Sequence, residues 1–177
     1  MKKLILSMVL ALLAGMGMGQ TDFQLFKVNV GDKAPEFQVE LTNGKTVNLA
    51  DLKGKIVLLD FYTTSCGVCI KALARAQEDI IDRFAGKDVV FLPISCGEDK
   101  AKIKEFVEKR GYKWASGVDP EGKIKSQYSD WGVPQYLVIG ADGKLMFAEI
   151  GSQGLYKALE IIEKTLEKKE NLQHESR

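Results

Sequence analysis

The alternation of apolar and polar positions from about residue 28 onward divides the chain into short strands and amphipathic helices. Ile56–Tyr62 is a nearly continuous apolar run, typical of a strand that is buried on both faces of a parallel sheet. Apolar residues then recur at helical spacing from Cys69 to Phe84, and Gly86 provides a C-terminal stop. This region therefore predicts a central strand followed by a helix.

A second buried strand is expected at Val89–Ile94, where Pro93 removes a ladder donor and predicts a bulge or an unpaired position. The other predicted elements are a hairpin of Phe37–Leu41 and Thr46–Leu49, a helix at Ala101–Arg110, a strand at Tyr112–Val118, a helix at Lys123–Tyr128, strands at Tyr136–Ile139 and Lys144–Ile150, and a helix at Leu155–Lys168. Alternating strands and helices predict an α/β fold with a mixed central sheet flanked by helices, preceded by an N-terminal hairpin.

The N-terminus has the pattern of a secretory signal peptide. Lys2 and Lys3 are followed by the apolar run Leu4–Met16 and by the small residues Gly17 and Gly19. The alternative is a retained membrane anchor, but the run is shorter than the roughly 20 apolar residues that span a bilayer. We therefore expect a signal peptide at 1–19, an exported domain at 20–169 and a flexible tail at 170–177, with a periplasmic or extracytoplasmic location.

The charge balance restricts the class of partner. The 177 residues carry a formal net charge of only +1. Nucleic-acid binding as the main activity is therefore not expected.

Two cysteines stand at the junction between the central strand and its helix, in the sequence Cys66-Gly67-Val68-Cys69. A helix N-terminus favours a thiolate, and residues three apart lie on one helix face, close enough to form a disulfide. The first thiol can attack a substrate disulfide and the second can resolve the mixed disulfide. Cys66 is therefore the expected nucleophile and Cys69 the resolving thiol.

A zinc half-site and a pair of packed core thiols are the alternatives for these cysteines. Zinc needs two more ligands, and only Cys96 and His174 remain as soft candidates. No metal and no cofactor are expected.

The segment from Asp60 to Cys69 resembles the active site of the thioredoxin superfamily, in particular its exported TlpA/ResA-like branch. Further segments resemble that branch as well: Val30–Phe37, Leu49–Lys55, Trp131–Pro134 and Ile139–Lys144. The likeness covers nearly all of residues 28–168. It implies a thioredoxin-like fold with a helix-containing insert before a cis-proline loop.

The resemblance also implies roles for Asp60 and Pro134. Asp60 matches a buried acid that takes the proton of Cys69, and burial in an apolar strand would raise its pKa; the alternative is an Asp held by backbone amides. Pro134 matches the cis-proline that faces the disulfide, with backbone groups of Val133 free to pair with substrate; the alternative is an ordinary trans proline.

The motif departs from the family pattern at several positions. Ser65 stands where Trp is usual, Val68 where plain thioredoxin has Pro, Ala72 where reductive members often carry Glu, and Ala74 where a helix-kinking Pro is usual. The candidate catalytic residues are Cys66, Cys69, Asp60 and Pro134. Those for substrate binding are Val133, Ser65, Gly67 and Val68.

Cys96 follows the second buried strand, and the carboxyl ends of neighbouring parallel strands meet at one sheet edge. We therefore consider it as an accessory thiol on the rim of the site. The alternative is a small buried apolar residue.

The expected function is thiol–disulfide exchange, with reduction of disulfides in exported proteins such as apocytochromes, and with a membrane thiol relay as electron donor. A peroxiredoxin-like thiol peroxidase is one alternative, since Thr63 precedes Cys66 by three residues as that motif requires; however, Leu59 stands where the motif needs Pro. A binding or chaperone module without redox activity is another.

Overall fold

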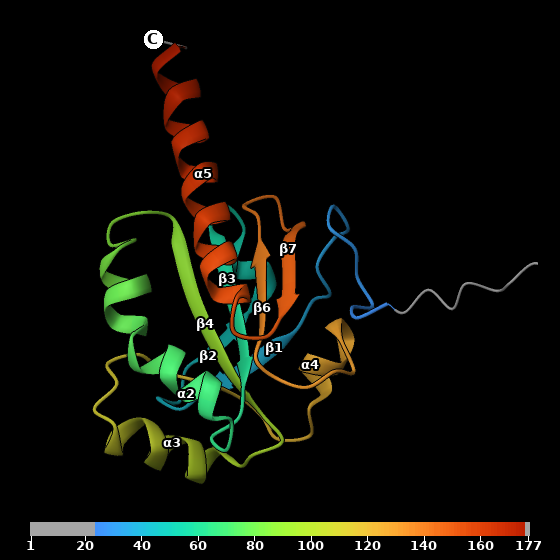
Figure 1. Cartoon of the computed structure of the whole chain (residues 1–177), viewed down its shortest axis with the longest axis vertical. Helices are drawn as coiled ribbons and strands as arrows, with labels where there is room; N and C mark the ends of the chain where they lie inside the picture. Colours follow the sequence, from blue (N-terminus) through green and yellow to red (C-terminus); the bar gives the residue numbers. More distant parts are fainter. Residues whose placement is uncertain (1–23, 176–177) are drawn as a thin grey trace, which may run out of the picture.

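The strands form one seven-stranded sheet in the order β2-β1-β5-β4-β3-β6-β7 (Figure 1). The computed structural model describes residues 24–175, so the predicted signal peptide lies outside the described residues. The strands are β1 (Gln38–Leu41), β2 (Thr46–Asn48), β3 (Ile56–Tyr62), β4 (Val89–Cys96), β5 (Gly117–Asp119), β6 (Gln135–Ile139) and β7 (Leu145–Ile150). The helices are α2 (Gly67–Ala74), α3 (Lys100–Lys109), α4 (Lys123–Tyr128) and α5 (Gly154–Glu175), with a 3-10 turn η2 (Leu49–Leu52) and a π-helical segment η3 (Gln77–Asp82).

The centre of the sheet is parallel and its margins are antiparallel. Strand β3 pairs in parallel with β4, and β4 with β5, whereas β6 runs antiparallel to both β3 and β7. On the other margin, β1 pairs antiparallel with β5 and with β2. The mixed sheet and the N-terminal hairpin that the sequence predicts are confirmed.

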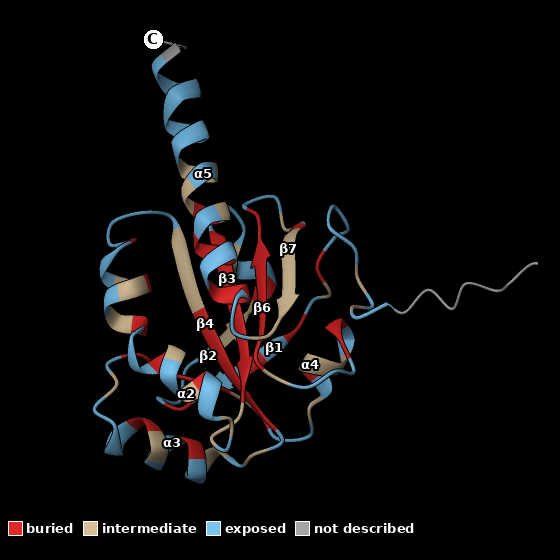
Figure 2. Ribbon diagram, viewed as in Figure 1, coloured by how far each residue is buried: buried red, intermediate tan, exposed pale blue. Residues whose placement is uncertain are grey.

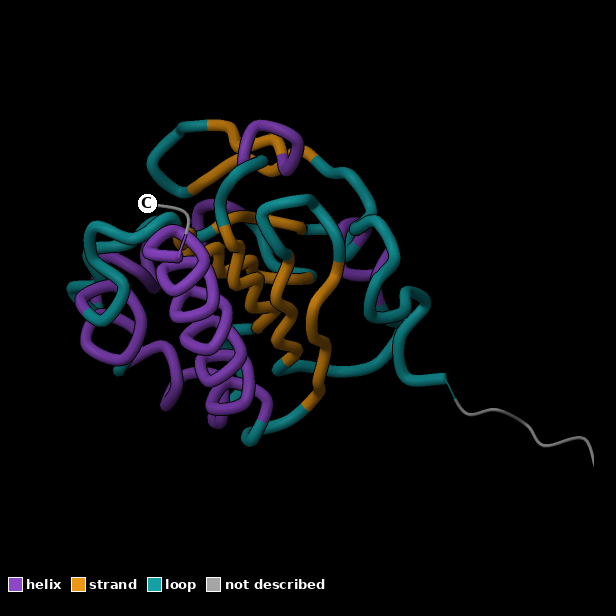
Figure 3. The backbone as a smooth tube through the Cα atoms, turned by 90° about the horizontal axis from the view of Figure 1, so that it is seen from above, coloured by secondary structure: helices purple, strands orange, loops and turns teal. Residues whose placement is uncertain are grey.

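Two apolar layers cover the two faces of the sheet, and the buried strands between them are drawn in red in Figure 2. On one face Leu58 and Tyr62 pack against α2, η3, α3 and α5. On the other face Leu59 and Phe61 pack against α4, η2 and the segment that precedes β1. Figure 3 shows the C-terminal helix with neighbouring helical segments on one side of the strands. Because side chains alternate along β3, Asp60 lies on the α2 face.

The expected irregularity at Pro93 takes a milder form than a bulge. The ladder between β3 and β4 runs without interruption through the pair Asp60 and Pro93. The carbonyl of Pro93 accepts a hydrogen bond from Ser116 Oγ on the β5 side, where the ladder begins only with Ile94 and Gly117. In a parallel strand the N–H and the C=O of one residue point to the same side. The N–H that Pro93 lacks would therefore face β5 where β4 and β5 are not yet paired, so no hydrogen bond of the sheet is lost.

The single helix expected over Cys69–Phe84 is interrupted. Helix α2 ends at Ala74 with Arg75 as its C-cap, and a π-helical segment follows. Leu73 and Ile80 nevertheless pack into the same apolar layer. The apolar stripe predicted the buried face correctly, but it does not distinguish an α-helical from a π-helical backbone.

Two other boundaries differ from the sequence prediction. Strand β5 begins at Gly117 instead of Tyr112, because Tyr112 and Trp114 stack with ring centroids 4.6 Å apart and pack onto the helical layer. Helix α5 continues through the expected tail to Glu175. Its exposed last turns are rich in Glu, Lys, Leu and Gln, which favour helix, and they contain no Gly or Pro to end it.

Candidate active site

The end of β3 delivers the cysteine pair to the N-terminus of α2. Cys66 is the N-cap of this helix, and its Sγ accepts a hydrogen bond from the backbone N of Cys69 at 3.2 Å. The two cysteines form a disulfide with their Cα atoms 5.3 Å apart. The sulfur of Cys66 thus takes the place that an Asp or Ser oxygen usually takes at a helix start.

The two sulfurs differ in their access to solvent. Cys66 is half-buried, and Cys69 is fully buried against the sheet. Ser65, Gly67 and Val68 are exposed around Cys66. Only the Cys66 sulfur is therefore placed for an encounter with a second protein.

The loop before β6 faces the pair. The Val133–Pro134 bond is cis, as the family resemblance implies, and Pro134 is buried. The Sγ of Cys66 lies 4.0 Å from the carbonyl oxygen of Val133. The disulfide and this carbonyl together form an edge that an extended chain can approach.

Two side chains that the sequence analysis did not identify hold this loop. Lys125 Nζ donates to the carbonyl of Trp131 at 2.6 Å, and the buried Gln135 donates from Nε2 to the carbonyls of Trp131 at 2.8 Å and Gly132 at 3.0 Å. Asp119 in turn accepts from the backbone N of Lys125 at 3.0 Å. The only sequence signal for these two side chains was their closeness to Pro134.

Asp60 lies behind the pair on the same face of the sheet as Cys69. It is 2% exposed, its Oδ1 has no hydrogen-bond partner, and burial raises its pKa to about 8. In the β3–β6 ladder it stands directly opposite Tyr136. The raised pKa is the direction that the sequence predicts, and no backbone amide compensates the carboxyl as the alternative requires.

Glu98 is a second acid at the same sheet edge, partly buried, and the sequence analysis missed it. Its side chain is 8% exposed and accepts from the backbone N of Thr64 at 2.8 Å, from the Thr64 hydroxyl and from Ser95 Oγ at 2.7 Å. Lys102 Nζ pairs with it at 2.7 Å. Burial alone would raise the pKa of Glu98, but the hydrogen bonds from Lys102, Thr64 and Ser95 outweigh it and hold the pKa below its usual range.

Glu98 therefore ties the loop that enters the cysteine motif to the end of β4. The signal that could have found it is its position just after a strand parallel to β3, the same argument that drew attention to Cys96.

Cys96 is the last residue of β4, so it lies at the expected sheet edge but on the opposite face from Cys69. It is 6% exposed, and its Sγ donates a long contact of 3.6 Å to the carbonyl of Ile94. Burial raises its pKa to about 12. This environment favours the buried apolar alternative over the accessory thiol.

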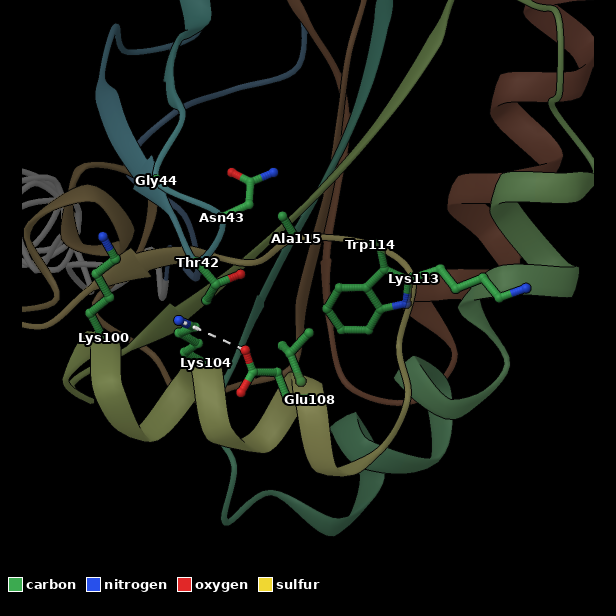
Figure 4. Close-up of a pocket in the computed structure, with 10 residues that line it drawn as sticks. Thr42, Asn43, Gly44, Lys100, Lys104, Glu108, Lys113, Trp114 and Ala115 are labelled. Atoms are coloured by element: carbon green, nitrogen blue, oxygen red, sulfur yellow. Dashed lines mark ion pairs between the residues drawn. The ribbon is translucent and has the colours of Figure 1, made fainter.

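Metal ligands, membrane-spanning helices and cavities in the described part of the chain also bear on what the site can do. Within residues 24–175 no cluster of three His, Cys, Asp or Glu side chains is arranged to hold a metal ion, and no helix has the length and apolarity to cross a membrane. A hollow of about 470 Å³ lies between α3 and the β1–β2 turn, edged by Lys100, Lys104 and Trp114 (Figure 4). None of its lining residues belongs to the cysteine motif or to the cis-proline loop.

The chain is similar to several known proteins. Residues 30–148 match the model of the AhpC/TSA family. The thiol–disulfide oxidoreductase ResA of Bacillus thuringiensis (strain Al Hakam) is 32% identical over 156 residues, which covers 85% of this chain and 90% of ResA. ResA of Bacillus subtilis (strain 168) is 29% identical and covers 71% of this chain and 69% of its own length.

Solved structures agree with these relatives. A Bacteroides thetaiotaomicron protein, proposed to be a protein disulfide isomerase, superposes with a TM-score of 0.74 at 28% identity, covering 84% of this chain and 97% of its own. The exposed lipoprotein thioredoxin Etrx1 of Streptococcus pneumoniae gives a TM-score of 0.61 at 29% identity, covering 71% and 98%. The AhpC/TSA match at residues 30–148 includes the cysteine pair at 66–69.

Proposed function

Because the chain belongs to the AhpC/TSA family and is a thiol–disulfide oxidoreductase related to ResA, we propose that it reduces disulfides of exported proteins through a Cys66–Cys69 dithiol. The observation that carries this proposal is the position of Cys66. Its sulfur caps α2 and is accessible, while its partner Cys69 lies fully buried directly behind it.

The first step is the attack of Cys66 on the substrate. In the reduced protein the Cys66 thiolate attacks one sulfur of a substrate disulfide, and a bond forms between the two proteins. The other substrate sulfur leaves as a thiolate and takes a proton from water. The backbone N–H of Cys69 and the helix N-terminus favour negative charge on the Cys66 sulfur.

The second step releases the product. Cys69 gives its proton to the ionised form of Asp60 and attacks Cys66, so that the mixed disulfide breaks and the second substrate sulfur leaves as a thiolate, which then takes a proton from water. The substrate gains two electrons and two protons, and the cysteine pair loses them. A carboxyl whose pKa is about 8 suits this role, because near neutral pH it can both accept and return a proton.

The substrate is held by the rim of the site. The backbone of Val133, presented by the cis Pro134, pairs with an extended substrate segment, and Ser65, Gly67 and Val68 contact its side chains. Ser65 in place of the usual Trp leaves a smaller and more polar opening. We expect a substrate range that differs from that of Trp-containing relatives.

The location and the electron donor are parts of the same proposal. Residues 1–19 have the pattern of a cleaved signal peptide, and Etrx1 is described as an exposed lipoprotein. We propose an extracytoplasmic protein that is reduced by a membrane thiol relay and acts on disulfides such as those of apocytochromes.

The reduction potential of the Cys66–Cys69 pair tests the direction of electron flow. Equilibration of the mature protein with glutathione and with dithiothreitol is expected to give a value near about −270 mV, as in thioredoxin. A value near about −120 mV would indicate an oxidant that donates its disulfide, and the proposed direction would be reversed. Consumption of hydrogen peroxide by the reduced protein, measured in parallel, distinguishes a thiol peroxidase.

A further inference from the structure

A groove of about 390 Å³ runs beside the disulfide, between the outer side of α2 and the first turn of α5. Both helices cover the same face of the sheet (Figure 1). Val68, which lies between the two cysteines, is 47% exposed at one end, and Tyr156 of α5 is 60% exposed. We call this the α2–α5 groove and define it by Val68, Lys71, Ala72, Arg75 and Tyr156.

The charges along the α2–α5 groove do not cancel. Arg75 is neutralised by Asp79, which also lines the groove, through contacts of 3.0 Å and 3.1 Å. Lys71 is exposed and forms no ion pair with any residue of the described chain. The groove therefore presents apolar surface from Val68 and Tyr156 next to one uncompensated positive charge.

The position of Lys71 sets its distance from the chemistry. It is five residues after Cys66, which corresponds to about 7.5 Å along the α2 axis. An extended chain advances about 3.3 Å per residue. A substrate whose cysteine meets Cys66 and whose chain follows the α2–α5 groove would therefore bring its residue two or three positions away to the level of Lys71 along the helix axis.

We infer that the α2–α5 groove binds the substrate segment adjacent to the reacting cysteine, and that Lys71 selects disulfide-bonded proteins carrying Asp or Glu two or three residues from that cysteine. This inference rests on the proposed function, because it names the class of protein substrate for the same site. An acidic side chain there is attracted by Lys71, and a basic one is repelled. The apolar surface of Val68 and Tyr156 accommodates a neighbouring uncharged side chain.

The test uses disulfide-bonded peptides that differ only in the residue two positions from the cysteine, which is Glu, Gln or Lys. For the reduced mature protein at low salt we expect kcat/KM to be about fivefold higher for Glu than for Gln, and lower again for Lys. Since the groove is open to solvent, this preference should shrink as salt is added. Each rate is divided by the same protein's rate with 2-hydroxyethyl disulfide, so that a general change in thiol reactivity cancels.

Three variants make the result specific to the groove. Lys71→Met keeps most of the apolar stem and is expected to remove the preference, whereas Lys71→Glu is expected to reverse it. Lys45→Glu, on the exposed β1–β2 turn, makes the same change in net charge away from the groove and should retain the wild-type preference.

Equal rates for the three peptides, or an unchanged preference in Lys71→Glu, would overturn the inference. If Lys45→Glu reverses the preference for Glu as strongly as Lys71→Glu does, the preference comes from net charge, and the inference is overturned as well. Failure of the wild-type protein to turn over 2-hydroxyethyl disulfide would instead contradict the proposed function. Concentration-dependent association that Lys71→Glu abolishes would show that a second copy of the chain occupies the groove, against the inference.

Discussion

Strands β3 and β4 are parallel neighbours that end at the same edge of the sheet, and each leads through a cysteine to a helix. Cys66 lies beyond the end of β3, caps α2 with its sulfur, and forms the disulfide. Cys96 is still within β4, faces the opposite layer, and is nearly fully buried. Helix α3, which follows it, is capped by Asp99 instead. The two cysteines share one edge of the sheet, but they differ in sheet face and in helix capping, and on this ground we expect Cys66 and not Cys96 to be the reactive thiol.

The largest expected difference between the two cysteines is in catalysis. Cys66→Ser should lower the turnover of 2-hydroxyethyl disulfide by at least about a hundredfold, because the attacking thiolate is gone. Cys96→Ser should stay within about twofold of wild type. Coupled-assay rates for both variants make the measurement. A large loss of rate in Cys96→Ser, with the fold intact by circular dichroism, would contradict the comparison.

A buried carboxyl, Asp60, lies on the sheet face of Cys69 and away from Cys96, and it should affect stability through its pKa. Its pKa of about 8 in the folded chain lies above the ordinary value of 3.8, so the folded chain keeps a proton that the unfolded chain loses. The contribution of Asp60 to the free energy of unfolding should therefore be highest below pH 4, fall as pH rises, and level off above about pH 8. Relative to Asp60→Asn, the oxidised wild type should lose about 1.4 kcal/mol per pH unit, or nearly 3 kcal/mol between pH 5 and 7.

Urea unfolding of the oxidised wild type and Asp60→Asn across this pH range checks the prediction. A constant offset from the Asn side chain does not matter, because only the slope of the difference against pH is used. Parallel curves for the two proteins would mean that Asp60 is ionised in the folded chain, and the proton-transfer role would lose its basis.

Glu98 links the segment after β3 to the end of β4 through Thr64 and Ser95. Removing Glu98 therefore tests how much this link contributes to the stability of the fold. Glu98→Ala leaves the backbone N–H of Thr64 and the hydroxyl of Ser95 without their acceptor, and we expect a loss of about 2 kcal/mol in unfolding free energy. Lys102→Met removes only an exposed partner, whose interaction is screened by solvent, and should cost clearly less than Glu98→Ala. Equal losses in the two variants would show that the ion pair with Lys102, and not the hydrogen bonds from Thr64 and Ser95, holds the ends together.

The pH dependence of Glu98 has the opposite sign from that of Asp60. Because its pKa is lowered in the folded chain, the stability that the ionised form contributes is present above about pH 4.5 and is lost as the pH falls below it. The difference between wild type and Glu98→Ala should therefore shrink in acid, in the same urea experiments.

The sequence predicted most of the sheet and the cysteine site, because these depend on local pattern. Ile56–Tyr62 is a strand with the expected bounds, and the spacing of Cys66 and Cys69 placed them on one turn of a helix. The contacts of Glu98 and Gln135 could not be predicted in the same way. Glu98 meets Thr64 across 34 residues of sequence, and the carbonyls that Gln135 holds are exposed only by the course of the loop.

The same reasoning explains the element boundaries that were wrong. The apolar pattern of Tyr112 and Trp114 is satisfied equally by a strand or by a stacked aromatic pair, and tertiary packing chose the second. The sequence placed Cys96 at the right edge. It did not establish its face, because that depends on where β4 ends relative to its pleat.

Cys96 itself should be nearly inert toward alkylation in the folded protein. With a pKa of about 12 and 6% exposure, its thiol should hardly ionise at pH 8, so the oxidised native protein should react with iodoacetamide at least about a hundredfold more slowly than the unfolded chain. Intact mass after timed quenching gives both rates, and Cys96→Ala supplies the unlabelled control. Because only folding separates the two samples, rapid labelling of the native protein would mean that β4 opens at its end and exposes the thiol. Cys96 would then regain its place as an accessory thiol beside Cys66.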